Sequence, residues 1–343
     1  MQKNNFDFLR FVFALIVVLS HIVDLSQHPD LLFLKKYFDS HLSVTGFFII
    51  SGYLIAGSYV NTKDTRKYFV KRAKRLLPAY IFVVLFAAVM FSFISTQTFA
   101  TYFSSPQLYK YLLSNLSFLN FLQPCLPGVF GSNLLCTVNG ALWTIKVEVS
   151  FYLFLPILIY IIHRFDRKFW VFGLLYFLGL SYQFGLKALS LMKPEKAAFF
   201  EVLQHQLPGF LTYFMAGISL YYFKDIFQKY RNSLSLISLL VFVIEYYFNW
   251  EVFRPMAMAI LILYCATGFK FLNNFGRYGD FSYGIYIYHF PIIQTAVSLQ
   301  LFQLYPPFLV GFVILVCLGT TAYVSWNLLE KRFLQRTLHR QNS

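Results

Sequence analysis

The chain has 343 residues, of which 58% are hydrophobic and 21% aromatic, while only 13% are charged. Soluble proteins carry roughly 25% charged residues, so this composition excludes an ordinary soluble domain and indicates a membrane protein. The formal net charge of +15 would fit a nucleic-acid binder, but the basic residues lie in short segments between apolar runs, an arrangement that orients a membrane protein. We therefore expect the lipid bilayer, and no nucleic acid, as a partner.

Ten apolar segments follow one another along the chain, each near the roughly 20 residues that cross a bilayer. Helix is the expected structure because a backbone exposed to lipid must satisfy its own hydrogen bonds. The sequence thus predicts an all-α fold, a polytopic helical bundle over residues 1–335, followed by a short cytoplasmic tail over 336–343. The predicted spans are 6–25, 42–60, 76–95, 141–162, 168–186, 205–223, 233–250, 253–271, 280–299 and 306–328.

The distribution of Lys and Arg predicts the orientation of these spans. With the N-terminus in the cytoplasm, the inner segments hold 21 of the 29 basic residues and the outer segments hold 7. This excess on the inside places both termini in the cytoplasm. The first apolar run is short enough for a signal peptide, but no small-residue cleavage site follows it, so we expect an uncleaved first span.

The first span, FDFLRFVFALIVVLSH, carries ionisable residues, which are costly in lipid and therefore indicate function. Arg10 and His21 are eleven residues apart, about 20° beyond three helical turns, so they share one face about 16 Å apart. Asp7 lies one turn before Arg10 and can pair with it. The simpler alternatives are that Arg10 is an anchor that reaches lipid headgroups and that His21 is a packing or interfacial histidine.

The next two spans carry a small-residue motif and a basic segment. In FFIISGYL, Ser51 precedes a glycine, a pattern that favours close helix packing over chemistry. The segment YFVKRAKRLLPAY, predicted as a loop leading into the third span, carries Arg72 and Arg75 at helical spacing. An arginine pair at a membrane mouth can hold phosphates through paired hydrogen bonds. The alternative is that these charges bind lipid headgroups.

The long segment over 96–140 is predicted as an extracytoplasmic loop. It contains Cys125 and Cys136, eleven residues apart. Because the outer compartment is oxidising, we expect a disulfide between them, with two free thiols as the alternative. No Cys or His cluster with ligand spacing predicts a metal site.

The fourth span, GALWTIKVEVSFYLFLP, places Thr144, Glu148 and Tyr152 on one face, since they are four residues apart. Glu148 is predicted about 10 Å from the outer end of its helix, a depth compatible with that of His21. A carboxylate there can orient an imidazole and raise its basicity. The alternative is a structural ion pair of Glu148 with Lys146 or another base.

The ninth span, GDFSYGIYIYHFP, carries a polar stripe on an otherwise apolar helix. Ser282, Tyr286 and His289 follow at intervals of four and three residues and so share a face. His289 is predicted about 13 Å in from the cytoplasmic boundary.

Taken together and in this order, these motifs resemble those of the membrane-bound acyltransferase family 3, the bacterial surface-glycan O-acyltransferases. The resemblance runs almost end to end. The matching positions are Asp7, Arg10 and His21 in the first span, Ser51 in the second, Arg72, Arg75 and Pro78 at the third, Trp143, Glu148 and Tyr152 in the fourth, Ser282, Tyr283, Tyr286, His289 and Pro291 in the ninth, and Glu330 at the end.

The resemblance implies an enzyme of the bacterial inner membrane that uses cytoplasmic acyl-coenzyme A as donor substrate, most simply acetyl-coenzyme A, and holds no permanent cofactor. Arg10, Arg72 and Arg75 are expected to bind the coenzyme phosphates. His21, supported by Glu148, is expected to act as general base or acyl carrier. The other residues expected to line the site are Asp7, Ser51, Trp143, Thr144, Tyr152, Ser282, Tyr283, Tyr286 and His289.

The expected acceptor is a hydroxyl of an envelope polysaccharide such as the lipopolysaccharide O-antigen. Many members of the family carry a soluble esterase-like domain after the last span. None is present in this sequence, so the final transfer is expected either in the membrane domain itself or on a separate extracytoplasmic partner. The competing function is a proton-coupled transporter of a lipid-linked saccharide, against which the sequence shows no evident two-halves repeat.

Overall fold

The computed structural model describes residues 4–62 and 64–334, and these residues form an all-α polytopic membrane protein. The predicted tail over 336–343 lies outside the described residues. Within the described ranges the only extended pairing is one isolated bridge, between Cys125 and Thr137.

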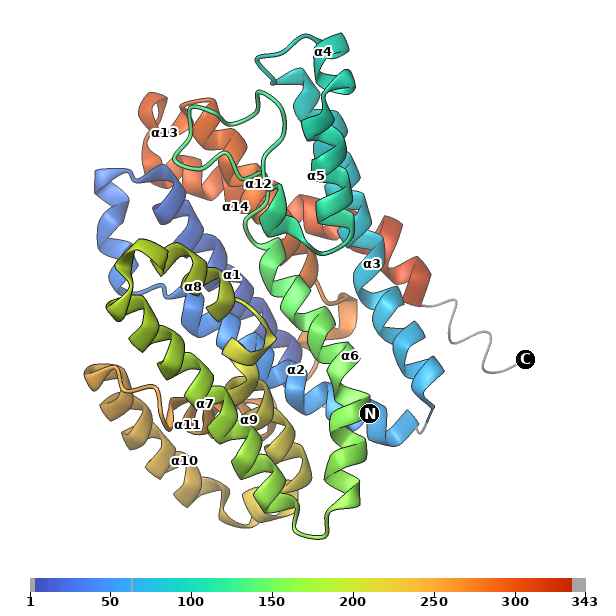
Figure 1. The fold of residues 1–343 in the computed structure, drawn as a ribbon, viewed down its shortest axis with the longest axis vertical. Coiled ribbons are helices and arrows are strands. Elements are labelled where there is room, and N and C mark those ends of the chain that lie inside the picture. The colour runs from blue at the N-terminus through green and yellow to red at the C-terminus, as the bar shows by residue number, and fades with distance from the viewer. Residues whose placement is uncertain (1–3, 63, 335–343) are drawn as a thin grey trace. The chain divides into compact units, whose positions relative to one another are not determined.

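Fourteen α-helices and several short turns make up the described chain (Figure 1). The α-helices are α1 Phe6–Ser26, α2 Ser40–Thr62, α3 Thr65–Met90, α4 Phe99–Ser104, α5 Pro106–Leu116, α6 Leu142–Arg164, α7 Lys168–Met192, α8 Ala197–Gln204, α9 Leu211–Tyr222, α10 Lys224–Phe248, α11 Arg254–Gly268, α12 Ser282–Ser298, α13 Leu301–Leu304 and α14 Pro307–Ser325. The short elements are η1 Pro29–Lys36, η2 Phe91–Phe93, η3 Asn120–Leu122, η4 Pro194–Lys196, η5 Leu207–Phe210, η6 Phe275–Tyr278 and the π-helical turn η7 Trp326–Glu330.

Each of the ten predicted spans coincides with a helix, but not all of these helices have the same length. Seven helices in the described part of the chain are long and apolar enough to cross a membrane: α1, α2, α3, α6, α7, α10 and α14. The predicted spans at 205–223, 253–271 and 280–299 correspond to the shorter helices α9, α11 and α12, with 12, 15 and 17 residues. α9 is buried from Leu211 to Leu220, so protein rather than lipid covers most of it.

Two segments that were predicted as loops contain helices. The basic segment before the third span is helical, because α3 begins at Thr65 and runs through Pro78. Lys and Arg are good helix formers, and a proline inside a membrane helix is tolerated where neighbouring groups satisfy the freed backbone. The segment over 96–140 contains α4, α5 and η3. α5 begins with Pro106 after Ser105, whose hydroxyl accepts a hydrogen bond from the backbone N–H of Gln107.

The chain divides into two compact units. Unit 1 consists of the described parts of Met1–Leu9, Val44–Phe69 and Val147–Phe275, and unit 2 of those of Arg10–Ser43, Val70–Lys146 and Gly276–Ser343. The chain passes from one unit to the other within α1, α2, α3 and α6.

Unit 1 is organised around close contact between α2 and α9. A Cβ atom added at Gly52 would lie 2.3 Å from the carbonyl oxygen of Phe214, and one added at Gly217 would lie 2.1 Å from that of Ile49. The two backbones therefore touch where both helices carry glycine. This contact is the close helix packing predicted for the glycine of the FFIISGYL segment. α7, α9, α10 and α11 pack beside one another in the same unit (Figure 1).

Unit 2 contains α12 and α14, which pack along each other, and the segment between α5 and α6, which is fastened to α12. The Gln294 side chain is fully buried and donates from Nε2 to the carbonyl oxygens of Leu135 and Thr137, both at 2.7 Å. Its Oε1 accepts from Asn133 Nδ2 at 2.8 Å. Both N–H donors and the oxygen of this amide are thus directed to one segment.

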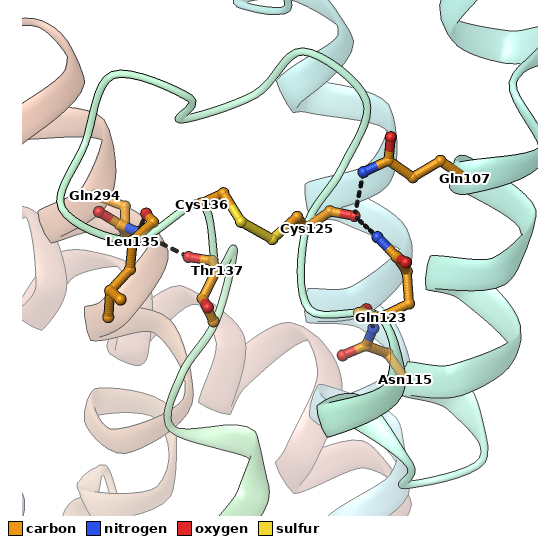
Figure 2. Close-up of a disulfide and its surroundings, with 8 residues drawn as sticks. All are labelled: Gln107, Asn115, Gln123, Cys125, Leu135, Cys136, Thr137 and Gln294. Carbon is orange, nitrogen blue, oxygen red and sulfur yellow. Dashed lines mark hydrogen bonds between the residues drawn. A yellow bond between two sulfur atoms is a disulfide. The ribbon is translucent and has the colours of Figure 1, made fainter. Parts of the chain in front are cut away.

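A disulfide joins Cys125 and Cys136 within that segment, with the two Cα atoms 5.3 Å apart (Figure 2). The carbonyl oxygen of Cys125 accepts from Gln123 Nε2 at 2.8 Å and from Gln107 Nε2 at 3.4 Å. The disulfide closes the segment on itself, while Gln294 fastens it to α12.

Replacing Gly52 by alanine is expected to destabilise the protein by about 1–3 kcal/mol, because the added methyl group overlaps a backbone oxygen that cannot rotate away. The thermal midpoint of the detergent-purified protein measures this. Gly173→Ala on α7 is the matched control, since no atom lies within 4 Å of a Cβ there, and it is expected to be neutral or to stabilise by about 0.5–1 kcal/mol. Equal midpoints for the two variants would contradict the packing account.

Removing the disulfide by Cys125→Ser and Cys136→Ser together is expected to cost about 3 kcal/mol, the loop-closure value for a short loop. The readout is again the thermal midpoint, measured without reductant. Cys317→Ser is the control, because Cys317 is a free and exposed cysteine. The expectation fails if the double variant and the wild type unfold together, or if reductant leaves the wild-type midpoint unchanged.

Candidate active site

Two histidines from α1 and α12 form the centre of a polar group in unit 2. His21 Nδ1 lies 2.7 Å from His289 Nε2. The two imidazole rings are nearly parallel, with centroids 5.0 Å apart and an interplanar angle of 6°. The ring of Phe290 meets His21 edge-on at 5.4 Å. His289 is 0% exposed and His21 is partly exposed, so of the two residues only His21 keeps accessible surface.

The neighbouring polar residues hold this pair in place. His289 Nδ1 lies 2.6 Å from the carbonyl oxygen of Tyr286, on the preceding turn of α12. The hydroxyl of Thr144, in the first turn of α6, donates to the carbonyl oxygen of Ala141 at 2.9 Å. Since that uses its proton, the Tyr286 hydroxyl must donate to Thr144 Oγ1, 2.8 Å away. The predicted residues His21, Thr144, Tyr286 and His289 therefore meet.

A cluster of charges lies at the N-terminal end of α12. The Asp280 carboxylate pairs with Arg10 at 3.0 Å and with Arg75 through a short contact. It also accepts hydrogen bonds from the backbone N–H of Ser282 at 3.1 Å and from the Ser282 hydroxyl. A carboxylate between two guanidinium groups stays ionised, so these three charges sum to +1. Arg72 lies one turn before Arg75 on α3.

Sequence analysis missed Asp280. It lies just before the predicted stripe of the ninth span, and its carboxylate accepts a hydrogen bond from the backbone N–H of Ser282, the first residue of α12. A signal for this residue was present in the sequence. An acid at the boundary of a span needs a basic partner, and Arg10 and Arg75 are predicted near the same boundary.

Other motif residues of unit 2 have hydrogen bonds that join its helices. The Tyr283 hydroxyl donates to the carbonyl oxygen of Leu76 on α3 at 2.8 Å. The Ser325 hydroxyl donates to Glu330 at 3.2 Å and lies 3.0 Å from the hydroxyl of Tyr288. Trp143 lies in the first turn of α6.

The remaining predicted site residues belong to unit 1. They are Asp7 on α1, Ser51 on α2, and Glu148 and Tyr152 on α6. The Tyr152 hydroxyl donates a short hydrogen bond to Glu148. The pairing of Glu148 with His21 joins residues of different units and stays a prediction. Lys146, the alternative partner of Glu148, lies in unit 2 with Nζ 4.8 Å from the centroid of the Phe121 ring.

Within the residues that the structure describes, no group of three or more His, Cys, Asp or Glu side chains is arranged to hold a metal ion.

The chain matches the family model of the acyltransferase domain over residues 3–325, and it belongs to that family. It is similar to the O-acetyl transferase of Shigella phage Sf6, with 28% identity over 98% of each chain. It is also similar to nodulation protein 10 of Rhizobium leguminosarum bv. viciae, with 26% identity over 87% of this chain and 85% of that one. No solved structure matches it. The protein is thus a membrane-embedded O-acyltransferase.

Replacing Asp280 by asparagine is expected to destabilise the protein by roughly 2–3 kcal/mol, because two guanidinium groups lose their shared counter-charge while the shape of the side chain is kept. This loss of stability is at the low end of the range for breaking a buried ion pair. Both arginine side chains retain 23% exposure, so solvent screens part of the interaction. The measurement is the thermal midpoint in detergent. Asp225→Asn, at an exposed position on α10, is the control and should change stability by less than about 0.5 kcal/mol.

Proposed function

We propose that the protein moves an acyl group, most simply acetyl, from cytoplasmic acyl-coenzyme A to a hydroxyl of an envelope polysaccharide such as the lipopolysaccharide O-antigen. Its location would be the bacterial inner membrane. The observation that carries the proposal is the His21–His289 pair, a partly exposed imidazole supported by a buried one. The similarity to a phage O-acetyl transferase supports acetyl as the group transferred.

His21 acts as the general base in this reaction. Its Nδ1 is engaged by His289, so Nε2 is the nitrogen that takes the proton of the acceptor hydroxyl. The hydroxyl oxygen then bonds to the thioester carbonyl carbon, and the carbon–sulfur bond breaks. The proton passes from Nε2 to the sulfur of the departing coenzyme, which returns His21 to its starting state.

The lone pair on His21 Nε2 that takes the proton also allows a two-step variant of the reaction. His21 Nε2 attacks the thioester carbonyl carbon, the coenzyme thiol leaves, and the acyl-imidazole then passes its acyl group to the acceptor hydroxyl. In both versions Glu148 is proposed to support His21, and Thr144 and Tyr286 line the site through their hydrogen bond.

Arg10, Arg72 and Arg75 are proposed to bind the phosphates of the donor. Guanidinium groups suit this task because each offers paired N–H donors to phosphate oxygens. Asp280 holds Arg10 and Arg75 at one place, and their net positive charge remains available to an anion. The excess of Lys and Arg in the predicted inner segments supports a cytoplasmic donor side. The acceptor, and a separate partner that presents it, would lie on the other side.

The test uses membranes that contain the wild type or His21→Gln, labelled acetyl-coenzyme A and isolated acceptor polysaccharide. Gln keeps polarity but takes no proton, so label on the glycan should fall by at least about 100-fold. Thermal midpoint and yield of the purified variant check that it folds. A folded His21→Gln protein that labels the glycan at the wild-type rate would refute the proposal.

The same assay distinguishes the two chemical routes and the transporter alternative. Without acceptor, label on the His21 peptide indicates an acyl-enzyme, and its absence indicates the general-base route. A wild type that moves saccharide across the membrane but never labels it would show transport instead of transfer.

A further inference from the structure

We infer that His289 is a positioning residue that fixes the tautomer of His21, keeping the proton on Nδ1 and the lone pair on Nε2. This inference rests on the proposed role of His21. It concerns a residue that does not contact the reacting atoms and acts only through the 2.7 Å contact between the two rings.

The tautomer of His289 is set by the backbone. Its Nδ1 lies 2.6 Å from the carbonyl oxygen of Tyr286, and a carbonyl oxygen can only accept a hydrogen bond. His289 Nδ1 must therefore carry a proton. A neutral imidazole carries one proton, so Nε2 of His289 holds a lone pair and can only accept.

The tautomer of His21 follows from that of His289. His289 Nε2 accepts, so His21 Nδ1, 2.7 Å away, must donate and must carry the proton of the neutral ring. His21 Nε2 then holds a lone pair, which both the base route and the acyl-carrier route need. The opposite tautomer would set two lone pairs against each other between the rings and would block Nε2 with a proton.

The catalytic cycle keeps this arrangement. When His21 takes a proton on Nε2 it becomes an imidazolium, whose Nδ1–H is a stronger donor to His289 Nε2 than before. Protonating His289 on Nε2 would instead place two N–H groups against each other. The pair therefore holds one added proton, and that proton lies on His21, where the acceptor hydroxyl reacts.

The acidic residue nearest to His21 on α1 has partners of its own. Asp24, one turn after His21, accepts from the Ser20 hydroxyl at 3.3 Å and pairs with Lys35 at 3.0 Å. His289 is also held rigidly, because it is 0% exposed and the Tyr286 ring meets it edge-on at 5.7 Å. A tautomer fixed by a rigid partner needs no reorganisation before each turnover.

The competing interpretation is that His289 only fills space beside His21. Two substitutions separate these interpretations. His289→Leu keeps a similar volume but offers no acceptor, whereas His289→Gln offers an amide oxygen as acceptor and an amide N–H as donor. His163→Leu is the control, because His163 is an exposed histidine on α6.

We expect His289→Leu to lower kcat by about 100-fold or more, with little change in the KM for acetyl-coenzyme A, since a wrongly placed imidazole proton can cost up to about 10⁴-fold. His289→Gln should retain activity within about tenfold of the wild type, and His163→Leu should match it. Thermal midpoints show whether each variant folds. Full activity in His289→Leu would overturn the inference, as would an equal loss in both His289 variants.

A spectroscopic readout on the wild type tests the tautomer directly and does not depend on the folding of a His289 variant. In protein labelled with ¹⁵N-histidine, the wild type should show His21 with a protonated Nδ1 and an unprotonated Nε2 at neutral pH. Comparison with His21→Gln assigns the signal among the 7 histidines. A wild-type His21 protonated on Nε2 overturns the inference. If His21→Gln is itself active, the proposed function fails, whereas this spectrum still reports the tautomer.

Discussion

The cost of placing ionisable side chains in an apolar environment is the constraint on which unit 2 depends. Such groups are tolerated only when partners inside the protein satisfy them. α12 supplies most of these partners: His289 meets His21 of α1, Tyr286 meets Thr144 of α6, and Asp280, just before the helix, meets Arg10 and Arg75. The polar residues that carry the chemistry are therefore also the contacts that join α1, α3 and α6 to α12.

α12 is a 17-residue helix that is buried over most of its length. Its far end is fastened by Gln294, which holds the disulfide-closed segment between α5 and α6. Its near end is held by the arginine pair on Asp280. Between these two ends the position of His289 is fixed, and with it the position of the ring that contacts His21. A helix held at both ends gives the imidazole pair little freedom to separate.

Much of this arrangement could be predicted from the sequence, because the length and hydropathy of an apolar segment indicate a membrane helix. The ten spans and the motif residues His21, Thr144, Tyr286 and His289 follow from apolar runs and helical periodicity. The contact between His21 and His289 did not follow. Helical period shows which residues share a face of one helix, but it does not show which other helix that face meets. Compatible depth suggested Glu148, a pairing that stays a prediction, and the structure adds His289 at His21 Nδ1.

The central claim is that His21 Nε2 supplies the lone pair for acyl transfer. Chemical complementation with free imidazole can test this claim. His21→Gly leaves space for a free imidazole next to His289, and added imidazole can then supply the missing ring. The account predicts that His21→Gly transfers no labelled acetyl group by itself and that imidazole restores transfer in proportion to its concentration. Transfer by His21→Gly at the wild-type rate without imidazole would contradict it.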